Sequence, residues 1–178
     1  MKIETRTKTH EGLAAMQILA WIVFIGYLIE AGAIVISYGV SAVNPIAAKN
    51  LYLGLDLYNL RQLNFWQYSL SVSFLVALPV MKSLIAFLVI KTLSKFNMKN
   101  PFTPEVARKL EKISYVAFGT WCVTMLSNAY TSWLIKKTGH LYGSLLSGEF
   151  IFMVGLVYIM AWIFRRGVEI QSENDLTI

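Results

Sequence analysis

Four long segments of low polarity constrain the fold of this chain more than any other feature. They lie at about residues 13–38, 65–92, 104–135 and 149–166, and shorter polar segments separate them. A helix of about 20 apolar residues crosses a hydrocarbon core of about 30 Å. A bilayer offers no water to unpaired backbone groups, so such segments cross it as helices. The sequence therefore predicts an all-α integral membrane protein, a single domain built as a bundle of four transmembrane helices.

The composition excludes an ordinary soluble domain. Hydrophobic residues make up 56% of the 178 residues and charged residues only 15%, with a mean hydropathy of +0.55, whereas about a quarter of the residues in a typical soluble domain are charged. The net charge of +6 has the sign that nucleic acid attracts. The basic residues flank the apolar segments, however, where a membrane surface accounts for them. We therefore expect membrane lipid as a partner and no direct contact with nucleic acid.

The third segment predicts a helix that is too long for the bilayer. Thr103 is a suitable N-cap, Pro104 suits the first helical position, and Glu105 faces the positive end of the helix dipole. A helix of about 32 residues, from Pro104 to about Ile135, is roughly 48 Å long, which exceeds the hydrocarbon core. We expect the first turns of this helix to stand outside the bilayer, with Arg108, Lys109 and Lys112.

The first segment allows two interpretations. A basic start followed by an apolar run is typical of a signal peptide, and Ala31-Gly32-Ala33 resembles a cleavage site. The apolar run is longer than the roughly 7 to 15 residues of such a peptide, and it resumes at Ile34. A retained first transmembrane helix is the better interpretation.

Residues 39–66 form the longest polar interruption. The leucines of the stretch from Leu51 to Leu57 alternate with other residues, a period that favours a short strand. A second strand within residues 140–146 would pair with it in a small cap outside the membrane. Asn64 and Gln67 form a capping pair for the second helix, and Pro79 predicts a kink within that helix.

The distribution of Lys and Arg predicts the orientation. Eleven of the 16 lie in the N-terminal segment, in the stretch from Lys91 to Lys112 and at Arg165 and Arg166, which a four-helix topology places on one side. Four lie on the other side. Cytoplasmic segments of membrane proteins carry an excess of Lys and Arg. Both termini and the start of the third helix are therefore expected in the cytoplasm.

Polar residues inside the apolar segments form the first candidate site, the intramembrane polar cluster. Its members are Glu30, Lys82, Asn128 and Tyr158. A charge at the centre of a bilayer costs roughly 2.5 to 3.5 kcal/mol, so Glu30 and Lys82 need partners. One interpretation is a buried, hydrogen-bonded cluster that fixes the register of the helices. A second is a polar cavity that binds a small ligand or a lipid headgroup, and a third is a path for protons or ions.

The sequence contains no motif typical of catalysis or of metal binding. Nucleophile-elbow, zinc-protease and Cys-x-x-Cys motifs are all missing. The single cysteine, Cys122, lies in an apolar segment, and His10 and His140 are far apart without ligand spacing around either. We therefore expect no enzyme activity, no metal and no cofactor.

Two blocks of sequence carry a family resemblance. The first block is Asn100-Pro101-Phe102-Thr103-Pro104-Glu105, followed by Arg108 and Leu110, and the second runs from Phe164 to Ile178. They resemble the loop before the third helix and the closing motif of a bacterial group of four-helix membrane proteins, domain-of-unknown-function family 2975. The resemblance implies a location in the bacterial inner membrane and no established activity. It also implies a gene that is often found beside one for a small helix-turn-helix regulator of the Cro/CI type.

In a four-helix topology the two blocks meet at the inner membrane surface and form a second candidate site, the two-block patch. A soluble partner can recognise such a surface, and its basic face can bind lipid headgroups or an acidic partner. The acidic residues of the second block can instead pair with bases of the first block within the chain. The residues of the two-block patch are Asn100, Pro101, Phe102, Arg108, Lys109, Arg165, Arg166, Glu169 and Asp175.

Two functions from different classes follow from these sites. The first is a non-enzymatic inner-membrane protein that tethers, or signals to, a cytoplasmic helix-turn-helix transcriptional regulator through the two-block patch. The alternative is a small transporter, a lipid- or ligand-binding protein or an immunity-type membrane protein that uses a pocket at the intramembrane polar cluster. A cavity lined by Glu30 and Lys82 would favour the alternative.

Overall fold

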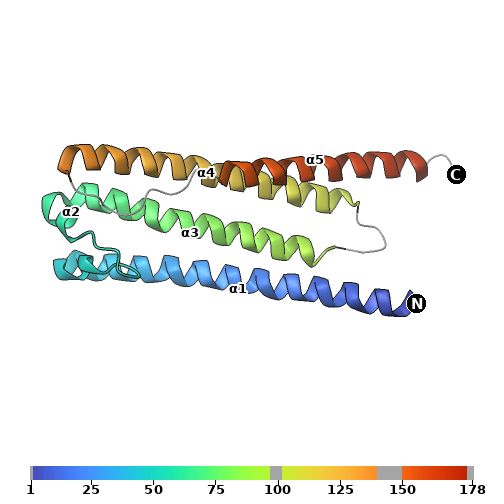
Figure 1. The fold of residues 1–178 in the computed structure, drawn as a ribbon, viewed down its shortest axis with the longest axis horizontal. Coiled ribbons are helices and arrows are strands. Elements are labelled where there is room, and N and C mark those ends of the chain that lie inside the picture. Colours follow the sequence, from blue (N-terminus) through green and yellow to red (C-terminus); the bar gives the residue numbers. More distant parts are fainter. Residues whose placement is uncertain (1, 97–101, 140–149, 176–178) are drawn as a thin grey trace. The chain divides into compact units, whose positions relative to one another are not determined.

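The computed structural model describes residues 2–96, 102–139 and 150–175, and these residues form helices and no strand. Figure 1 labels the α-helices. The elements are α1 (Lys2–Val43), a short 3-10 helix η1 (Pro45–Lys49), α2 (Tyr58–Leu63), α3 (Phe65–Leu93), α4 (Pro104–Thr138) and α5 (Phe150–Asp175). The prediction of an all-α protein is confirmed.

Three helices are long and apolar enough to cross a membrane, at Glu11–Val43, Phe65–Leu93 and Ile151–Glu173. Most of the apolar side chains in these stretches are not buried by protein, as expected of surfaces that contact lipid. Helix α4 is not among the three within the described residues. Its centre holds several polar side chains, namely Thr120, Thr124, Asn128 and Thr131.

The chain forms two compact units. The described residues of the first unit are 2–25, 83–96, 102–118 and 150–175, and those of the second unit are 26–82 and 119–139. Helices α1, α3 and α4 each contribute residues to both units. The intramembrane polar cluster and the two-block patch are therefore described unit by unit below.

The ends of three helices follow from local sequence. Val106 N donates to Thr103 Oγ1 over 3.3 Å at the start of α4, and Trp66 N and Gln67 N donate to Asn64 Oδ1 over 2.9 and 3.2 Å at the start of α3. Both capping predictions are confirmed. Helix α1 ends just before Asn44, whose extended backbone (φ −117°, ψ 101°) suits a residue that precedes proline.

Helices α1 and α5 are longer than expected. The sequence places their bounds near residues 13–38 and 149–166, whereas α1 begins at Lys2 and ends at Val43, and α5 ends at Asp175. No proline lies within either stretch, so the backbone continues as a helix past the apolar portion. Apolar length therefore underestimates these two helices.

The strand expected between Leu51 and Leu57 is wrong, because this stretch contains a tight turn. Leu53 and Gly54 have positive φ angles of 46° and 85°, which reverse the chain, and Leu51 N donates to Leu55 O over 2.9 Å. The strand proposed to pair with it, within residues 140–146, lies outside the described residues. The alternating leucines thus belong to a turn whose flanking residues Leu51 and Leu57 are buried, and not to an extended strand.

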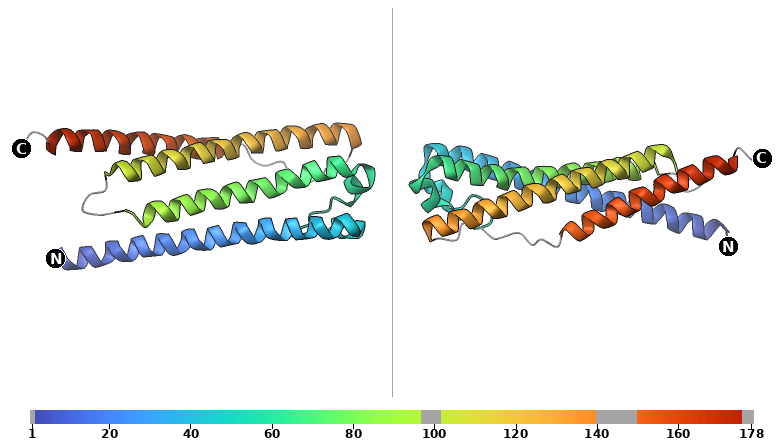
Figure 2. Two further views of the ribbon diagram at one scale, coloured as in Figure 1. Left: turned by 180° about the vertical axis from the view of Figure 1, so that it is seen from behind. Right: turned by 90° about the horizontal axis from the view of Figure 1, so that it is seen from above.

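The loop between α1 and α3 packs onto the main core of the second unit. Leu51, Leu57 and Leu60 are fully buried and contact the buried Ile34 of α1 and Leu134 of α4. Leu57 N donates to Ala48 O over 2.8 Å, and α2 packs on η1. Figure 2 shows this segment folded back beside the end of α1 in both views. Buried leucines thus fix the loop at this end of the second unit.

Candidate functional site: the two-block patch

In the first unit, the two sequence blocks contact each other through aromatic rings. Phe102, just before α4, packs on Phe164 of α5 with ring centroids 5.2 Å apart and an interplanar angle of 50°. The Phe102 ring also lies against Gly167, where an added Cβ would sit 2.5 Å from Cδ1 of the ring. Glycine at this position therefore lets the loop before α4 approach the backbone of α5.

An ion pair and a hydrogen bond extend this contact along α4. Arg165 Nη1 lies 3.7 Å from Glu111 Oε1, and the Tyr115 hydroxyl donates to the same oxygen over 3.2 Å. A cavity of about 40 Å³ lies beside them and is lined by Glu111, Arg165, Tyr158, Ala161 and Trp162. This volume is large enough for one water molecule, which the Glu111 carboxylate, the Arg165 guanidinium and the Tyr158 hydroxyl could bind.

Two basic residues of the patch have partners within the chain. Lys109 Nζ lies 3.0 Å from Glu105 Oε1 and donates to Lys91 O, also over 3.0 Å, at the carboxyl end of α3. Arg166 Nη1 lies 2.7 Å from Glu169 Oε2 on the same helix. The Lys109 ammonium holds the pKa of the exposed Glu105 carboxyl below its ordinary value, chiefly through this hydrogen bond.

Glu169 pairs within α5 and not with the bases of the first block. Among the described residues its ion-pair partner is Arg166, so pairing of Glu169 with Arg108 or Lys109 is not formed. Arg108, Arg165 and Arg166 are exposed at the surface of the first unit, the last two while paired with Glu111 and Glu169. Asn100 and Pro101 lie outside the described residues, as does the side chain of Asp175.

The intramembrane polar cluster is divided between the two units. Glu30, Lys82 and Asn128 belong to the second unit, whereas Tyr158 belongs to the first, where it lines the small cavity beside Glu111. Lys82 Nζ lies 5.5 Å from the centroid of the Tyr27 ring. Tyr27 lies on α1, about one helical turn before Glu30. No ion pair joins Lys82 and Glu30 in the part of the chain that the structure describes. The side chains of Lys82 and Glu30 are partly exposed and do not pair with each other.

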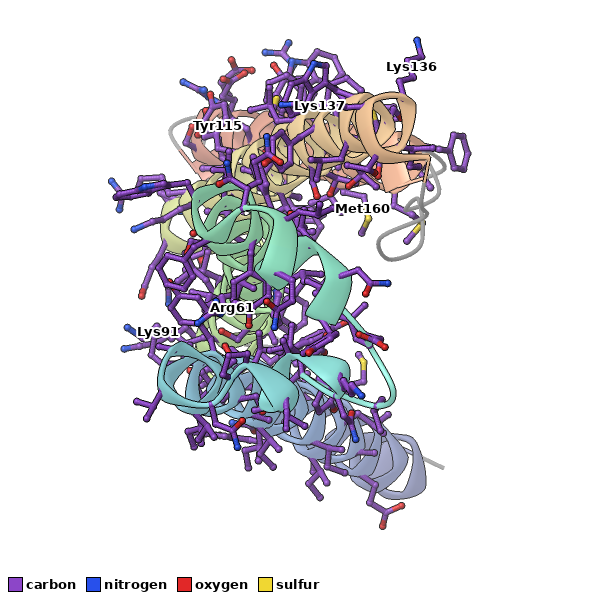
Figure 3. The ribbon with its side chains drawn as sticks, turned by 90° about the vertical axis from the view of Figure 1, so that its left-hand side faces the viewer. Arg61, Lys91, Tyr115, Lys136, Lys137 and Met160 are labelled. Carbon is purple, nitrogen blue, oxygen red and sulfur yellow. The ribbon has the colours of Figure 1, made fainter. Side chains whose placement is uncertain are left out.

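The sequence reasoning missed a second polar site, at the end of α1. Arg61 of α2 donates from Nε to Ser41 O over 3.2 Å and from Nη2 to Ala42 O over 3.3 Å, so it caps the carboxyl end of α1. The Ser41 and Tyr68 hydroxyls lie 2.5 Å apart in the same buried region. Figure 3 shows Arg61 pointing toward α1 from α2. Its acceptors are backbone carbonyls, which leave no signal in the sequence.

Neither site has the composition of a metal centre. Within residues 2–96, 102–139 and 150–175, no three His, Cys, Asp or Glu side chains are placed to hold a metal ion. Cys122 is a partly buried free thiol.

Comparison with known proteins gives one family. A model of the family described as proteins of unknown function, DUF2975, matches residues 43–178. Searches of curated proteins and of solved structures gave no match. The matched range covers most of the chain and includes both sequence blocks, which confirms the resemblance read from them. The chain belongs to the DUF2975 family.

Proposed function

We propose that this chain is a non-enzymatic inner-membrane protein that presents the two-block patch to a cytoplasmic helix-turn-helix regulator. The observation that carries the proposal is the packing of Phe102 on Phe164 and Gly167. This packing joins two separate sequence blocks into one surface. The close approach of the Phe102 ring requires a glycine at position 167, so the contact between the two blocks depends on packing as well as on ion pairs.

The surface offers charges that suit an acidic partner. Arg165 and Arg166 are exposed on α5, and their guanidinium groups have more donors than their pairs with Glu111 and Glu169 use. Arginine is favoured at protein interfaces because it binds carboxylates in a fixed geometry. A regulator with a complementary acidic face would bind here.

The proposed topology is a four-helix bundle in which α4 is the fourth span and both termini lie in the cytoplasm. The excess of Lys and Arg beside the first block, the second block and the N-terminus supports this orientation. Reporter enzymes fused after Asp175 and within the 44–57 loop test it, because each reporter is active on one side of the membrane only. A fusion after Asp175 that reports the periplasm would overturn the proposed orientation.

Binding to a small helix-turn-helix regulator of the Cro/CI type tests the function directly. The full chain in lipid nanodiscs is titrated with the purified regulator, together with a variant that ends at Val168 and a variant with Gly155→Leu. We expect saturable binding by the full chain and by Gly155→Leu, whose position has open space around it. We expect the truncated variant to bind more weakly, because it lacks Glu169 and Asp175 of the two-block patch. Binding that is indifferent to the truncation would overturn the proposal.

The alternative, a transporter or ligand-binding protein with a pocket at Glu30 and Lys82, has weaker support. The Lys82 ammonium contacts the Tyr27 ring. Neither the cavity beside Tyr158 nor the groove along α3 has Glu30 or Lys82 in its lining.

A further inference from the structure

A groove of about 430 Å³ runs along α3 in the second unit. Val35 and Tyr38 of α1 form one side, and α3 forms the other from Ser69 to Val80. From Ser69 to Val80 the helix axis rises about 17 Å, close to half of a hydrocarbon core of about 30 Å. The groove is therefore as long as one leaflet is thick.

The polar groups that line the groove already form hydrogen bonds within the protein. The Ser73 hydroxyl donates to Ser69 O over 2.8 Å, and the hydroxyls of Ser69 and Tyr38 lie 2.8 Å apart. The other side chains that line it are apolar, and the small residues Ser69, Ser73 and Ala77 recur every four positions on α3 and leave room beside the helix. An apolar chain of one leaflet's length fits this surface, whereas a polar ligand would lose its hydrogen bonds to water.

Cations lie at the end of the groove nearest Tyr38. The Tyr38 ring stacks on Phe65 with centroids 6.4 Å apart, and the Arg61 guanidinium lies 4.8 Å from the centroid of Phe65. Arg61 uses Nε and Nη2 on the carbonyls of α1, which leaves Nη1 for an anion.

The second unit carries further positive charges at the end of α4. Lys136 and Lys137 are exposed at the end of α4, where Figure 3 shows them. This end of α4 lies beside the loop, because Leu134 packs in the same core as Leu57. The one acid among the described residues 44–64, Asp56, accepts a hydrogen bond from Tyr58 N.

We propose that the groove holds one acyl chain of an anionic phospholipid whose phosphate binds Arg61. The apolar wall binds the acyl chain, and the positive charge of the guanidinium favours a headgroup with net negative charge over the zwitterionic headgroup of phosphatidylethanolamine. This site is separate from the two-block patch and does not depend on the proposed regulator.

Lipid retention tests the proposal. The full chain is reconstituted in nanodiscs of mixed phosphatidylethanolamine and phosphatidylglycerol, released in mild detergent, and analysed by native mass spectrometry. We expect one phosphatidylglycerol per chain. Ala77→Leu fills the groove and should lower retention about tenfold, while Ala129→Leu, at an exposed position of α4, should retain the lipid. Arg61→Gln should lower the preference for phosphatidylglycerol about tenfold, the loss expected for one charged hydrogen bond.

Retention of the two lipids by the unchanged chain is also compared, because this measurement does not depend on how the variants fold. Equal retention of both lipids by the unchanged chain, or full retention by Ala77→Leu, would overturn the proposal. A dimer that Ala77→Leu disrupts, with no lipid bound, would assign the groove to a second copy of the chain and would likewise overturn it.

Discussion

The ring of Phe102 lies so close to Gly167 that no other residue fits at position 167 without displacing it. An added Cβ would approach Cδ1 of Phe102 to 2.5 Å and Cε1 to 2.9 Å. Glycine within a helix costs about 1 kcal/mol relative to alanine, and the packing of Phe102 at Gly167 offsets that cost. This contact joins the two sequence blocks that carry the family resemblance and lie within the range matched by the family model.

Alanine at position 167 should destabilise the protein. We expect Gly167→Ala to lower the free energy of unfolding by about 1 to 3 kcal/mol, because the Phe102 ring must move out of its packed position. Thermal unfolding in nanodiscs measures the effect. Gly155→Ala on the same helix meets nothing within 4 Å and should be neutral or stabilising by up to about 1 kcal/mol. Equal effects of the two variants would show that Phe102 does not pack on α5.

The buried pair of Ser41 and Tyr68 should contribute strongly to the second unit. Ser41→Ala removes the hydroxyl that lies 2.5 Å from the Tyr68 hydroxyl and leaves a buried polar group without its partner, at a cost of about 1 to 3 kcal/mol. Ser73→Ala is the matched control, since that exposed hydroxyl bonds only a carbonyl of its own helix. Thermal unfolding should show a larger loss of stability for Ser41→Ala than for Ser73→Ala. A larger loss for Ser73→Ala would contradict the importance of the Ser41–Tyr68 pair.

The Glu105 carboxyl should titrate below its ordinary range. Lys109 lowers its pKa in the folded protein, so the pair stabilises the fold at neutral pH and this contribution is lost as the pH falls through the folded-state pKa. Carbon-13 NMR of labelled Glu105 measures the value. Lys109→Met should raise the pKa of Glu105, whereas Lys112→Met should not. An unchanged pKa in Lys109→Met would disprove the pair.

Lys82 and Glu30 should contribute to stability independently. Lys82 contacts the Tyr27 ring, a contact worth roughly 0.5 to 2 kcal/mol, and no ion pair with Glu30 is formed among the described residues. In a double-mutant cycle, the effects of Lys82→Met and Glu30→Gln should add within about 0.5 kcal/mol. If Glu30→Gln restores the stability lost in Lys82→Met, the two form a structural ion pair after all.

The helices and two of their caps could be predicted because their causes are local. Apolar length identifies the helices, and Thr103 and Asn64 cap helices whose first amides lie two or three residues away. The turn at Leu53 was misread because alternating leucines indicate a strand unless a positive φ reverses the chain. A period of two in the sequence does not distinguish these cases.

The long-range contacts of both sites could be predicted only in part. A four-helix topology predicts that the two blocks meet, but nothing in the sequence pairs Phe102 with Gly167, because α5 also contains Gly155 and other helices contain further glycines. Arg61 binds backbone carbonyls of Ser41 and Ala42, and every residue offers such carbonyls. Contacts of this kind depend on the fold as a whole.

Site-specific photo-crosslinking in living cells tests the central proposal most directly. A photoreactive amino acid replaces Arg166 in the two-block patch, Lys112 on the adjoining turn of α4, or Leu63, an exposed residue of α2. We expect crosslinks to the helix-turn-helix regulator from positions 166 and 112 and none from position 63. Crosslinks from position 63 alone, or none from position 166 while the regulator is present, would contradict the assignment of the two-block patch as the docking surface.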